Sequence, residues 1–254
     1  MGERIVTVLN TRPEPGDFDD ALQARGLGCI HLPMIRIADP ESWDALDAAV
    51  DRMGQWDGVL LTSANAVRYF LRRLEERMLD VTDLPPVHLI GLKTAAVARR
   101  GGLLTASISE AAYGSAMAAD LPDVAGRHFL QPCSDIARDE VLTGVLDRGG
   151  QVQQVPVYRI LGPEAEIVNR LRALHAENGY DWAAFFSPSA VRYFIAALPE
   201  FLSDPRPVAV IGETTAVAAS ALGVHVDLVA HAQSAEALAD ALAERAARSA
   251  ERRA

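Results

Sequence analysis

Short hydroxyl-bearing turns are the segments of this chain best suited to chemistry. Six times, a Ser, Thr or Gly follows an apolar, strand-like run and begins a helix-like pattern. Such turns expose backbone N–H groups and the positive end of a helix, so they suit anions. Any one of these residues is better explained as an ordinary helix cap, but their repetition at matching strand ends favours a shared binding role. The candidate ligand contacts are Thr11, Arg12, Thr62, Ser63, Asn65, Lys93, Thr94, Ser134, Arg138, Ser187, Ser189, Thr214 and Thr215.

Tyr158 is the candidate for proton transfer. It stands near the end of a strand-like run, in Val157-Tyr158-Arg159, and a phenol there can protonate a leaving hydroxyl. An aromatic that merely packs on a strand is an equal alternative. Arg12 and Arg138 can pair with carboxylates, although a solvated surface arginine explains either of them somewhat better.

Several other chemistries lack their motifs. No GxGxxG follows the first strand-like run, and Gly91-Leu92-Lys93-Thr94 lacks the upstream glycine of a phosphate loop. GxSxG and HExxH are absent, and the two cysteines and six histidines form no metal-ligand spacing. His88 and His128 lie in strand-like runs and are expected to be interior groups. The net charge of −10 argues against a general nucleic-acid binder.

The elements that must position these residues occur twice. Three segments recur in one order, at offsets of 124 (187 − 63), 121 (212 − 91) and 123 (156 − 33) residues. The chain therefore contains two copies of one module, and two modules leave a cleft in which a small molecule can bind. The paired segments are 63–70 with 187–194, 90–95 with 211–216, and 32–37 with 155–160.

Strand-like and helix-like patterns alternate along both copies. This alternation predicts α/β architecture, with parallel sheets covered on both faces, in which ligands bind beyond the carboxyl ends of the strands. A helix is expected over residues 134–146, and the Ala/Arg-rich tail is expected to continue the last helix. The expected strands include residues 5–9, 29–37, 57–61, 87–90, 103–108, 127–130, 152–158, 182–186, 208–211 and 224–229.

Six short motifs, in order over nearly the whole chain, resemble the uroporphyrinogen-III synthase family. They are Thr11-Arg12-Pro13, Leu61-Thr62-Ser63-Ala64-Asn65-Ala66-Val67, Gly91-Leu92-Lys93-Thr94-Ala95, Val157-Tyr158-Arg159, Phe186-Ser187-Pro188-Ser189-Ala190-Val191 and Ile211-Gly212-Glu213-Thr214-Thr215-Ala216. The resemblance implies two flavodoxin-like parallel-sheet domains with an interdomain cleft, joined by a two-stranded connector at residues 32–37 and 155–160. It places residues 1–35 and 160–254 in one domain and residues 38–156 in the other. The repeat alone would suggest a simple split near residue 123.

The resemblance also implies a reaction. The family is a lyase that cyclises hydroxymethylbilane, inverting ring D and losing water, to give uroporphyrinogen III in tetrapyrrole biosynthesis. The substrate carries eight carboxylates, which the turns could hold through N–H groups and hydroxyls. Loss of its hydroxyl gives an azafulvene, which requires protonation of the leaving group and no metal or redox cofactor. Tyr158 matches the family's tyrosine, which is the usual candidate for that acid.

A second interpretation is a two-domain protein that binds a small polyanion without catalysis, and a nucleotide-dependent enzyme is a distant third. We expect the protein to be cytoplasmic, because its N-terminal residues resemble no signal segment and its apolar runs are too short for a membrane span. We expect no nucleic-acid or membrane partner, and a monomer with at most transient contact with the preceding enzyme of the pathway.

Overall fold

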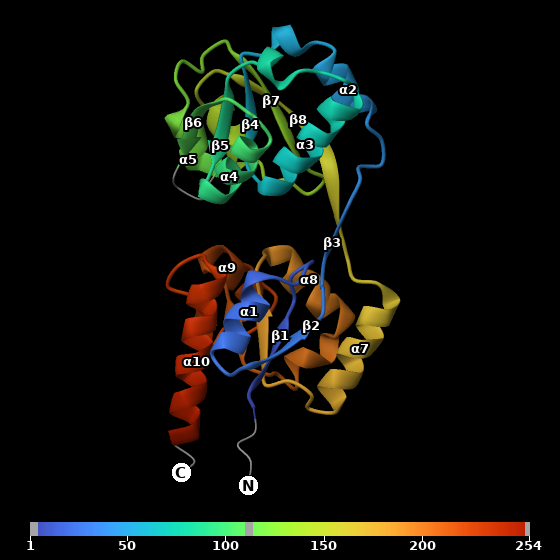
Figure 1. Ribbon diagram of the computed structural model, residues 1–254, viewed down its shortest axis with the longest axis vertical. Coiled ribbons are helices and arrows are strands. Elements are labelled where there is room, and N and C mark those ends of the chain that lie inside the picture. Colours follow the sequence, from blue (N-terminus) through green and yellow to red (C-terminus); the bar gives the residue numbers. More distant parts are fainter. Residues whose placement is uncertain (1–4, 110–113, 252–254) are drawn as a thin grey trace. The chain divides into compact units, whose positions relative to one another are not determined.

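The computed structural model describes residues 5–109 and 114–251, with side chains up to Arg248. The chain divides into two compact units (Figure 1). The terminal unit comprises the residues up to Arg36 and those from Leu161 onward, and the inserted unit spans Ile37–Ile160. The chain thus passes from one unit to the other twice, once inside the first repeated Pro-x-x-Arg-Ile segment and once directly after the second.

The terminal unit is built on a five-stranded sheet. Its strand order is β11-β10-β9-β1-β2, and all these neighbours pair in parallel. Counted within the unit, this is the 2-1-3-4-5 order of flavodoxin-like folds. The predicted α/β class with parallel sheets is confirmed. The strands are β1 (Thr7–Asn10), β2 (Gly28–His31), β9 (Trp182–Phe185), β10 (Val208–Val210) and β11 (Leu228–Val229).

Helices supply a core on each face of this sheet. Side chains from α1 and α10 pack with Val8 and Ala184 in one hydrophobic cluster. Phe185, the next residue along β9, contacts Phe194 of α8, with ring centroids 5.0 Å apart; successive strand residues point to opposite faces. Within the described residues, no helix is long and apolar enough to cross a membrane. The helices are α1 (Asp17–Ala24), α7 (Ala165–Ala176), α8 (Pro188–Ala197), η3 (Pro199–Leu202), α9 (Glu213–Ala221) and α10 (Ala235–Glu251).

The inserted unit is built on a six-stranded sheet in the order β3-β8-β7-β4-β5-β6. β3 and β8 carry the chain across the boundary between the units and are hydrogen-bonded neighbours, so the connector is two-stranded, as expected. The pairs from β8 to β6 are parallel. The strands are β3 (Arg36–Ala38), β4 (Gly58–Leu61), β5 (Val87–Ile90), β6 (Thr105–Ser109), β7 (His128–Ser134) and β8 (Gln151–Leu161).

Alternation along β4 again divides the core. Val59 and Leu61 join the cluster that contains residues of α2, α3 and α4, whereas Leu60 packs with residues of α5 and α6. The buried strands are thus covered on both faces, as near-continuous apolar runs in parallel sheets require. The helices are α2 (Asp44–Val50), η1 (Met53–Gln55), α3 (Ala64–Glu76), η2 (Val81–Asp83), α4 (Leu92–Arg100), α5 (Gly114–Asp120) and α6 (Glu140–Leu146).

The internal repeat explains why both sheets share one pattern. The repeated segments equate β4 with β9 and β5 with β10. Sheet position then equates β7 with β1 and β8 with β2, because β7 and β8 extend from β4 as β1 and β2 extend from β9. The terminal unit is therefore a circularly permuted version of the inserted one, with its last two strands supplied by the start of the chain.

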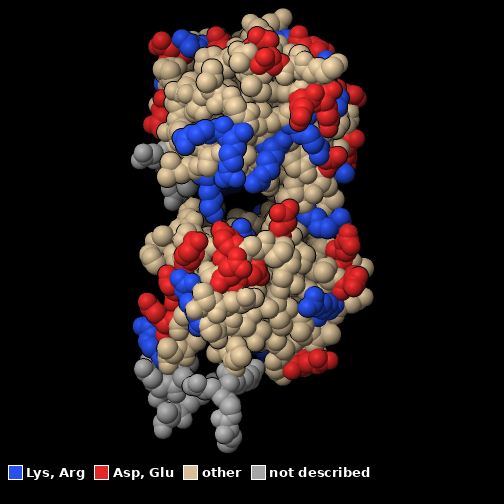
Figure 2. Space-filling model, viewed as in Figure 1, with Lys and Arg blue, Asp and Glu red and all other residues tan. Residues whose placement is uncertain are grey.

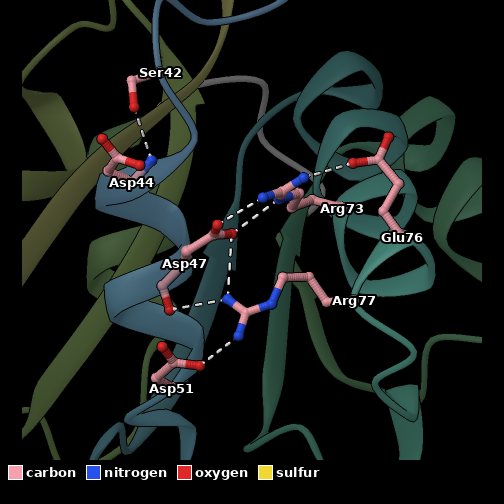
Figure 3. Close-up of polar contacts among 7 residues, drawn as sticks. All are labelled: Ser42, Asp44, Asp47, Asp51, Arg73, Glu76 and Arg77. Atoms are coloured by element: carbon pink, nitrogen blue, oxygen red, sulfur yellow. Dashed lines mark hydrogen bonds and ion pairs between the residues drawn. The ribbon is translucent and has the colours of Figure 1, made fainter.

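An ion-pair network fixes α2 against α3 in the inserted unit (Figure 3). The Arg73 guanidinium donates to both carboxylate oxygens of Asp47, at 2.8 and 2.6 Å, and to Glu76 at 2.8 Å. Arg77 donates to Asp51 at 2.6 Å and to the Asp47 carbonyl at 3.4 Å. The hydrogen bond from Arg73 is the main reason that the pKa of Asp47 lies below its usual value. These contacts are structural, because both guanidinium groups are paired with carboxylates of the same unit.

Several predicted elements are wrong in extent. The strand expected over residues 127–130 continues to Ser134 as β7. Residues 29–37 form two strands, because the regular ladder with the chain at β1 is lost after Leu32. The Leu32 N–H donates to the Asn10 carbonyl at 2.8 Å, but the Met34 N–H donates to the very next carbonyl, that of Thr11, at 3.2 Å, instead of one two residues on. Residues 134–146 are helical only from Glu140, since Ser134 still belongs to β7. Residues 224–229 contribute only the two-residue strand β11.

The two histidines in strands, His88 and His128, differ in exposure. His88 is buried, with Nδ1 2.8 Å from Ser107 Oγ, as expected of an interior group. His128 is exposed at the first position of β7, so the prediction of an interior histidine is wrong there. A residue at the end of a strand escapes the burial that its neighbours in the strand share.

Candidate active site

The inserted sheet has its topological switch point between β4 and β7. Successive connections run outward from this pair, toward β5 and β6 on one side and toward β8 on the other. Ligands of open α/β sheets bind beyond the carboxyl ends of the strands at such a point. Thr62 and Ser63 follow β4 directly, and Ser134 ends β7, so three of the predicted site residues lie at this edge.

Tyr158 lies at the same edge. It is on β8, opposite Ser134 in the strand register, and only 6 % of it is exposed. Its Oη lies 3.1 Å from Ser63 Oγ, and its ring centroid lies 5.6 Å from that of Tyr69 on α3. Burial raises the pKa of the Tyr158 phenol, while hydrogen bonds with the Ser63 and Ser134 side chains act in the lowering direction.

Ser63 is the N-cap of α3. Its Oγ accepts the Ala66 N–H at 3.0 Å, as expected for a serine before a helix. Within the first turns of the helix, the Asn65 side-chain carbonyl accepts from Arg68 at 2.8 Å. The structure thus brings Ser63, Ser134 and Tyr158 into one hydroxyl cluster, with Thr62 and Asn65 next to it in sequence.

The turn after β5 is the next one along this edge. Gly91 is the N-cap of α4 with φ of 75°, a conformation that favours glycine. Lys93 is exposed in the first turn of α4, whereas Thr94 is buried. Leu92 is 74 % exposed, an unusual degree for a leucine beside a buried strand. The turn therefore presents an ammonium group and an apolar side chain to solvent.

The corresponding turns of the terminal unit are more self-contained. Thr11 is fully buried, and its Oγ1 donates to the Ala184 carbonyl at 2.7 Å, which ties β1 to β9 at the switch point of this sheet. Arg12 forms an ion pair with Asp17, and its guanidinium lies 5.2 Å from the centroid of the Phe186 ring. Both predicted contacts thus have partners inside their own unit.

The remaining predicted contacts divide by exposure. Ser187 is half-buried and caps α8, accepting the Ala190 N–H at 3.2 Å. Thr214 is half-buried in the first turn of α9. Ser189 and Thr215 are buried, and Ser189 accepts from Arg192 at 3.1 Å. Arg138 in the inserted unit is exposed and paired with Glu140 at 2.8 Å.

Comparison with known proteins identifies the family to which the chain belongs. Residues 16–247 match the family model described as "Uroporphyrinogen-III synthase HemD". The chain belongs to the uroporphyrinogen-III synthase family. It is 27 % identical over 246 residues to the uroporphyrinogen-III synthase of Chlorobaculum parvum, covering 94 % of this chain and 98 % of the relative. It is 29 % identical over 193 residues to that of Synechococcus elongatus, covering 74 % and 73 %.

Solved structures of the family share this fold. A mutant uroporphyrinogen III synthase from Thermus thermophilus superposes with a TM-score of 0.69 at 19 % identity, covering 96 % of this chain and 99 % of its own. The uroporphyrinogen-III synthetase of Helicobacter pylori gives 0.65 at 18 % identity, covering 97 % and 99 %. At these identities the likeness concerns the fold alone.

Two features of this family member escaped sequence reasoning. Tyr69 packs beside Tyr158, and the repeat offered a signal for it, because Tyr69 returns as Tyr193. Cys29 donates to Asp19 at 2.9 Å, and burial raises the pKa of its thiol. Asp19 also accepts from Asn10. No spacing pattern in the sequence predicts the contact between Cys29 and Asp19.

Two other features of the described residues could carry chemistry, a metal site and a cavity. No group of three or more His, Cys, Asp or Glu side chains within residues 5–109 and 114–248 is placed to hold a metal ion. A cavity of about 220 Å³ lies at the amino ends of β7 and β8, the opposite end of the sheet from Ser134. Its lining residues are Arg52, Gln55, Trp56, His128, Gln151, Val152 and Gln153. The hydroxyl cluster is therefore the better candidate.

Proposed function

We propose that this protein is an enzyme that converts hydroxymethylbilane to uroporphyrinogen III, with inversion of ring D and release of water. Membership of the family over residues 16–247 supports the activity. The observation that carries the proposal is the position of Tyr158. It is a buried phenol within hydrogen-bond distance of the Ser63 hydroxyl, at the carboxyl edge of a parallel sheet, where ligands of such sheets bind.

The proposed first step is an elimination assisted by a proton. The C–O bond of the substrate's hydroxymethyl group breaks, and its electron pair leaves with the oxygen. Tyr158 gives its phenolic proton to that oxygen, so the leaving group is water, while the pyrrole nitrogen lone pair stabilises the vacated carbon as an azafulvenium cation, the protonated form of the azafulvene. A tyrosine phenol is protonated at neutral pH and can donate, and burial raises the pKa of Tyr158 further from neutrality.

Ring closure then restores the proton. The substituted α-carbon of ring D attacks the azafulvenium carbon and forms a spiro intermediate. The bond between that α-carbon and its original bridging methylene then breaks, the methylene bonds to the free α-carbon of ring D, and this second carbon releases its proton to give the inverted product. The Tyr158 phenolate is the base we assign to accept that proton. The sum is one hydroxymethylbilane converted to one uroporphyrinogen III and one water. Most of the task is geometric, since the enzyme must hold the reacting ends in an order that free closure does not favour.

We propose that the substrate carboxylates bind to the turns at the strand ends and to nearby cations. Backbone N–H groups at helix starts attract anions, and Lys93 is exposed in one such turn. On the face shown in Figure 2, Lys and Arg gather over α3 and α4 of the inserted unit, although the whole chain carries a net charge of −10. Arg68 is exposed on α3 and contacts the Asn65 amide. A local basic surface of this kind can attract a polyacid.

We also propose that the two compact units are the functional domains, residues 1–35 with 160–254 and residues 38–156. The expectations of a monomer in the cytoplasm, free of nucleic-acid and membrane partners, stay predictions. So does transient contact with the preceding enzyme of the pathway. The binding roles of the buried Thr11, Thr94, Ser189 and Thr215 also stay predictions.

Product analysis tests the proposal. Hydroxymethylbilane is supplied to the purified protein, and the products are oxidised and separated as porphyrin isomers. We expect isomer III in excess over a reaction without protein. If isomer I alone forms, as in uncatalysed head-to-tail closure, catalysis is refuted. Binding of hydroxymethylbilane without turnover would then favour the second interpretation, a polyanion-binding protein.

A further inference from the structure

We propose that Ser63 is a positioning residue whose hydroxyl donates to Tyr158 Oη and so leaves the phenolic proton directed at the substrate. The inference rests on the proposed function, in which Tyr158 supplies that proton. Sequence comparison within the chain treats Ser63 as a helix cap or a ligand contact. The structure gives it a different role, through the side chain it touches.

The helix cap uses one acceptor site of the Ser63 hydroxyl and leaves its proton free to donate to Tyr158. Ser63 Oγ already accepts the Ala66 N–H at 3.0 Å, and Tyr158 Oη lies 3.1 Å away. A serine hydroxyl has one proton to give, and Tyr158 Oη is the side-chain partner that the structure provides for it. With Ser63 donating, the phenol accepts from the serine and its own proton is available to another acceptor. That arrangement is the one a general acid needs.

Burial makes such donors necessary. Tyr158 is 6 % exposed, so water cannot fully solvate the phenolate that remains after proton transfer. Hydrogen bonds that donate to the charged form stabilise it. Ser134 lies opposite Tyr158 on β7, and its side chain acts on the pKa of the phenol in the same lowering direction as Ser63. We infer that both hydroxyls support the charge that develops on the phenol.

The duplicated module provides an internal comparison. Ser187, the repeat of Ser63, caps α8 in the same way by accepting the Ala190 N–H. The residue that repeats Tyr158 is Ile35 (158 − 123), which is buried and apolar. The same module thus folds with a serine cap and no phenol. Capping accounts for the serine in both copies, but the contact with a phenolic oxygen in the inserted unit is not needed to build the fold.

The central variant is Ser63→Ala. We expect kcat to fall about tenfold with little change in KM, since one hydrogen bond to a charged group is lost in the transition state. Ser63→Thr keeps a hydroxyl that can both cap and donate, so it should restore most of kcat. Ser234→Ala is the matched control, because Ser234 Oγ also accepts a backbone N–H, from Ala237 at 3.1 Å, at a helix start in the terminal unit. Its kcat should equal that of the unsubstituted protein.

A readout independent of activity separates this inference from the proposed function. In protein labelled with 3-fluorotyrosine, whose phenols titrate below those of tyrosine, ¹⁹F NMR follows each phenol, and Tyr158→Phe identifies the Tyr158 resonance. Ser63→Ala should move the Tyr158 titration to higher pH, and Ser234→Ala should not. Ser134→Ala, which removes no helix cap, should move it in the same direction and guards against misfolding of the Ser63 variant.

Each outcome has a distinct meaning. A Tyr158 titration that Ser63→Ala does not move overturns the positioning role of Ser63, whether or not isomer III is formed and whether or not Ser134→Ala moves it. A large rise in KM with an unmoved titration makes Ser63 a direct substrate contact instead. Failure of the unsubstituted protein to form isomer III removes the proposed function, but the shift in titration would still establish that Ser63 donates to Tyr158.

Discussion

Replacing Tyr158 by phenylalanine tests the proposed chemistry most directly. The change removes a single oxygen from a side chain that is otherwise packed in the core of the inserted unit. Ser63 keeps its hydrogen bond from Ala66 N–H, so α3 stays capped. The loss of one buried hydrogen bond costs about 1 kcal/mol, which lowers the Tm by about 2–4 °C for a protein of this size. The fold should therefore survive.

The effect on rate should be much larger than the effect on stability. Removing a general acid costs roughly 10²–10⁴-fold in rate, or about 3–5 kcal/mol in activation free energy. The unsubstituted enzyme should lose activity at alkaline pH, because the phenol must be protonated to donate and its raised pKa sets that limit above its ordinary value. The phenylalanine variant should lack this alkaline limb.

The assay compares initial rates of isomer III formation, with thermal melts run in parallel. Tyr180→Phe is the matched control. Tyr180 is 1 % exposed, and its hydroxyl lies 2.9 Å from His175 Nδ1 in the terminal unit. It should lose similar stability and keep its rate. A Tyr158→Phe enzyme with an unchanged rate would refute the assignment of the acid, and an equal loss of rate in both variants would trace the effect to stability.

Three further predictions concern other parts of the chain. Asp47→Asn should destabilise the inserted unit by about 1–2 kcal/mol in urea unfolding, because half-buried Arg73 and Arg77 lose a charged partner. The folded-state pKa of Asp47 lies below the ordinary value of 3.8, because Arg73 and Arg77 donate to its carboxylate. Its contribution to stability is therefore complete above pH 3.8 and is lost as the pH falls through the folded-state pKa. An Asn variant with the same acid sensitivity as the unsubstituted protein contradicts this. Thr11→Val should lower the free energy of unfolding by about 1–3 kcal/mol in urea unfolding, because the buried Ala184 carbonyl loses its donor. A change below ~0.5 kcal/mol would show that this carbonyl finds another partner. Lys93→Ala should raise KM several-fold with little change in kcat if this ammonium binds substrate carboxylates. An unaltered KM would exclude that role. The charge-matched control is Arg170→Ala, because Arg170 lies on α7, outside every strand-end turn.

Local sequence patterns predicted the layers of the fold well. The buried strands and their hydroxyl-bearing ends are visible because parallel strands are apolar throughout and helices begin at small polar residues. The serine caps at Ser63 and Ser187 are confirmed. Boundaries were less accurate where one residue decides them. Pro33 follows the end of β2, and the helix expected from Ser134 begins only at Glu140.

The contacts at the candidate site lay beyond local reasoning. Ser63 and Tyr158 are 95 residues apart, and Thr11 and Ala184 are 173 apart. No periodicity connects such positions, so the sequence could nominate Tyr158 and Ser63 separately but could not pair them. Nor could it show that Thr11 is buried within its own sheet. The permuted arrangement of the two units came from family resemblance, because the repeat alone suggests a division into two consecutive halves.

The pairing of β1 with β9 has a consequence for how the protein is made. As the chain leaves the ribosome, β1 and β2 emerge first, and the neighbour that β1 needs is translated 173 residues later at the Thr11–Ala184 contact. By then all of Ile37–Ile160 has been translated, and its contacts are internal. Domains generally fold as units during synthesis, so the inserted unit can fold while β1 still lacks its partner strand β9. A nascent chain that ends just before residue 182 would contain the whole inserted unit but only the first two strands of the terminal unit.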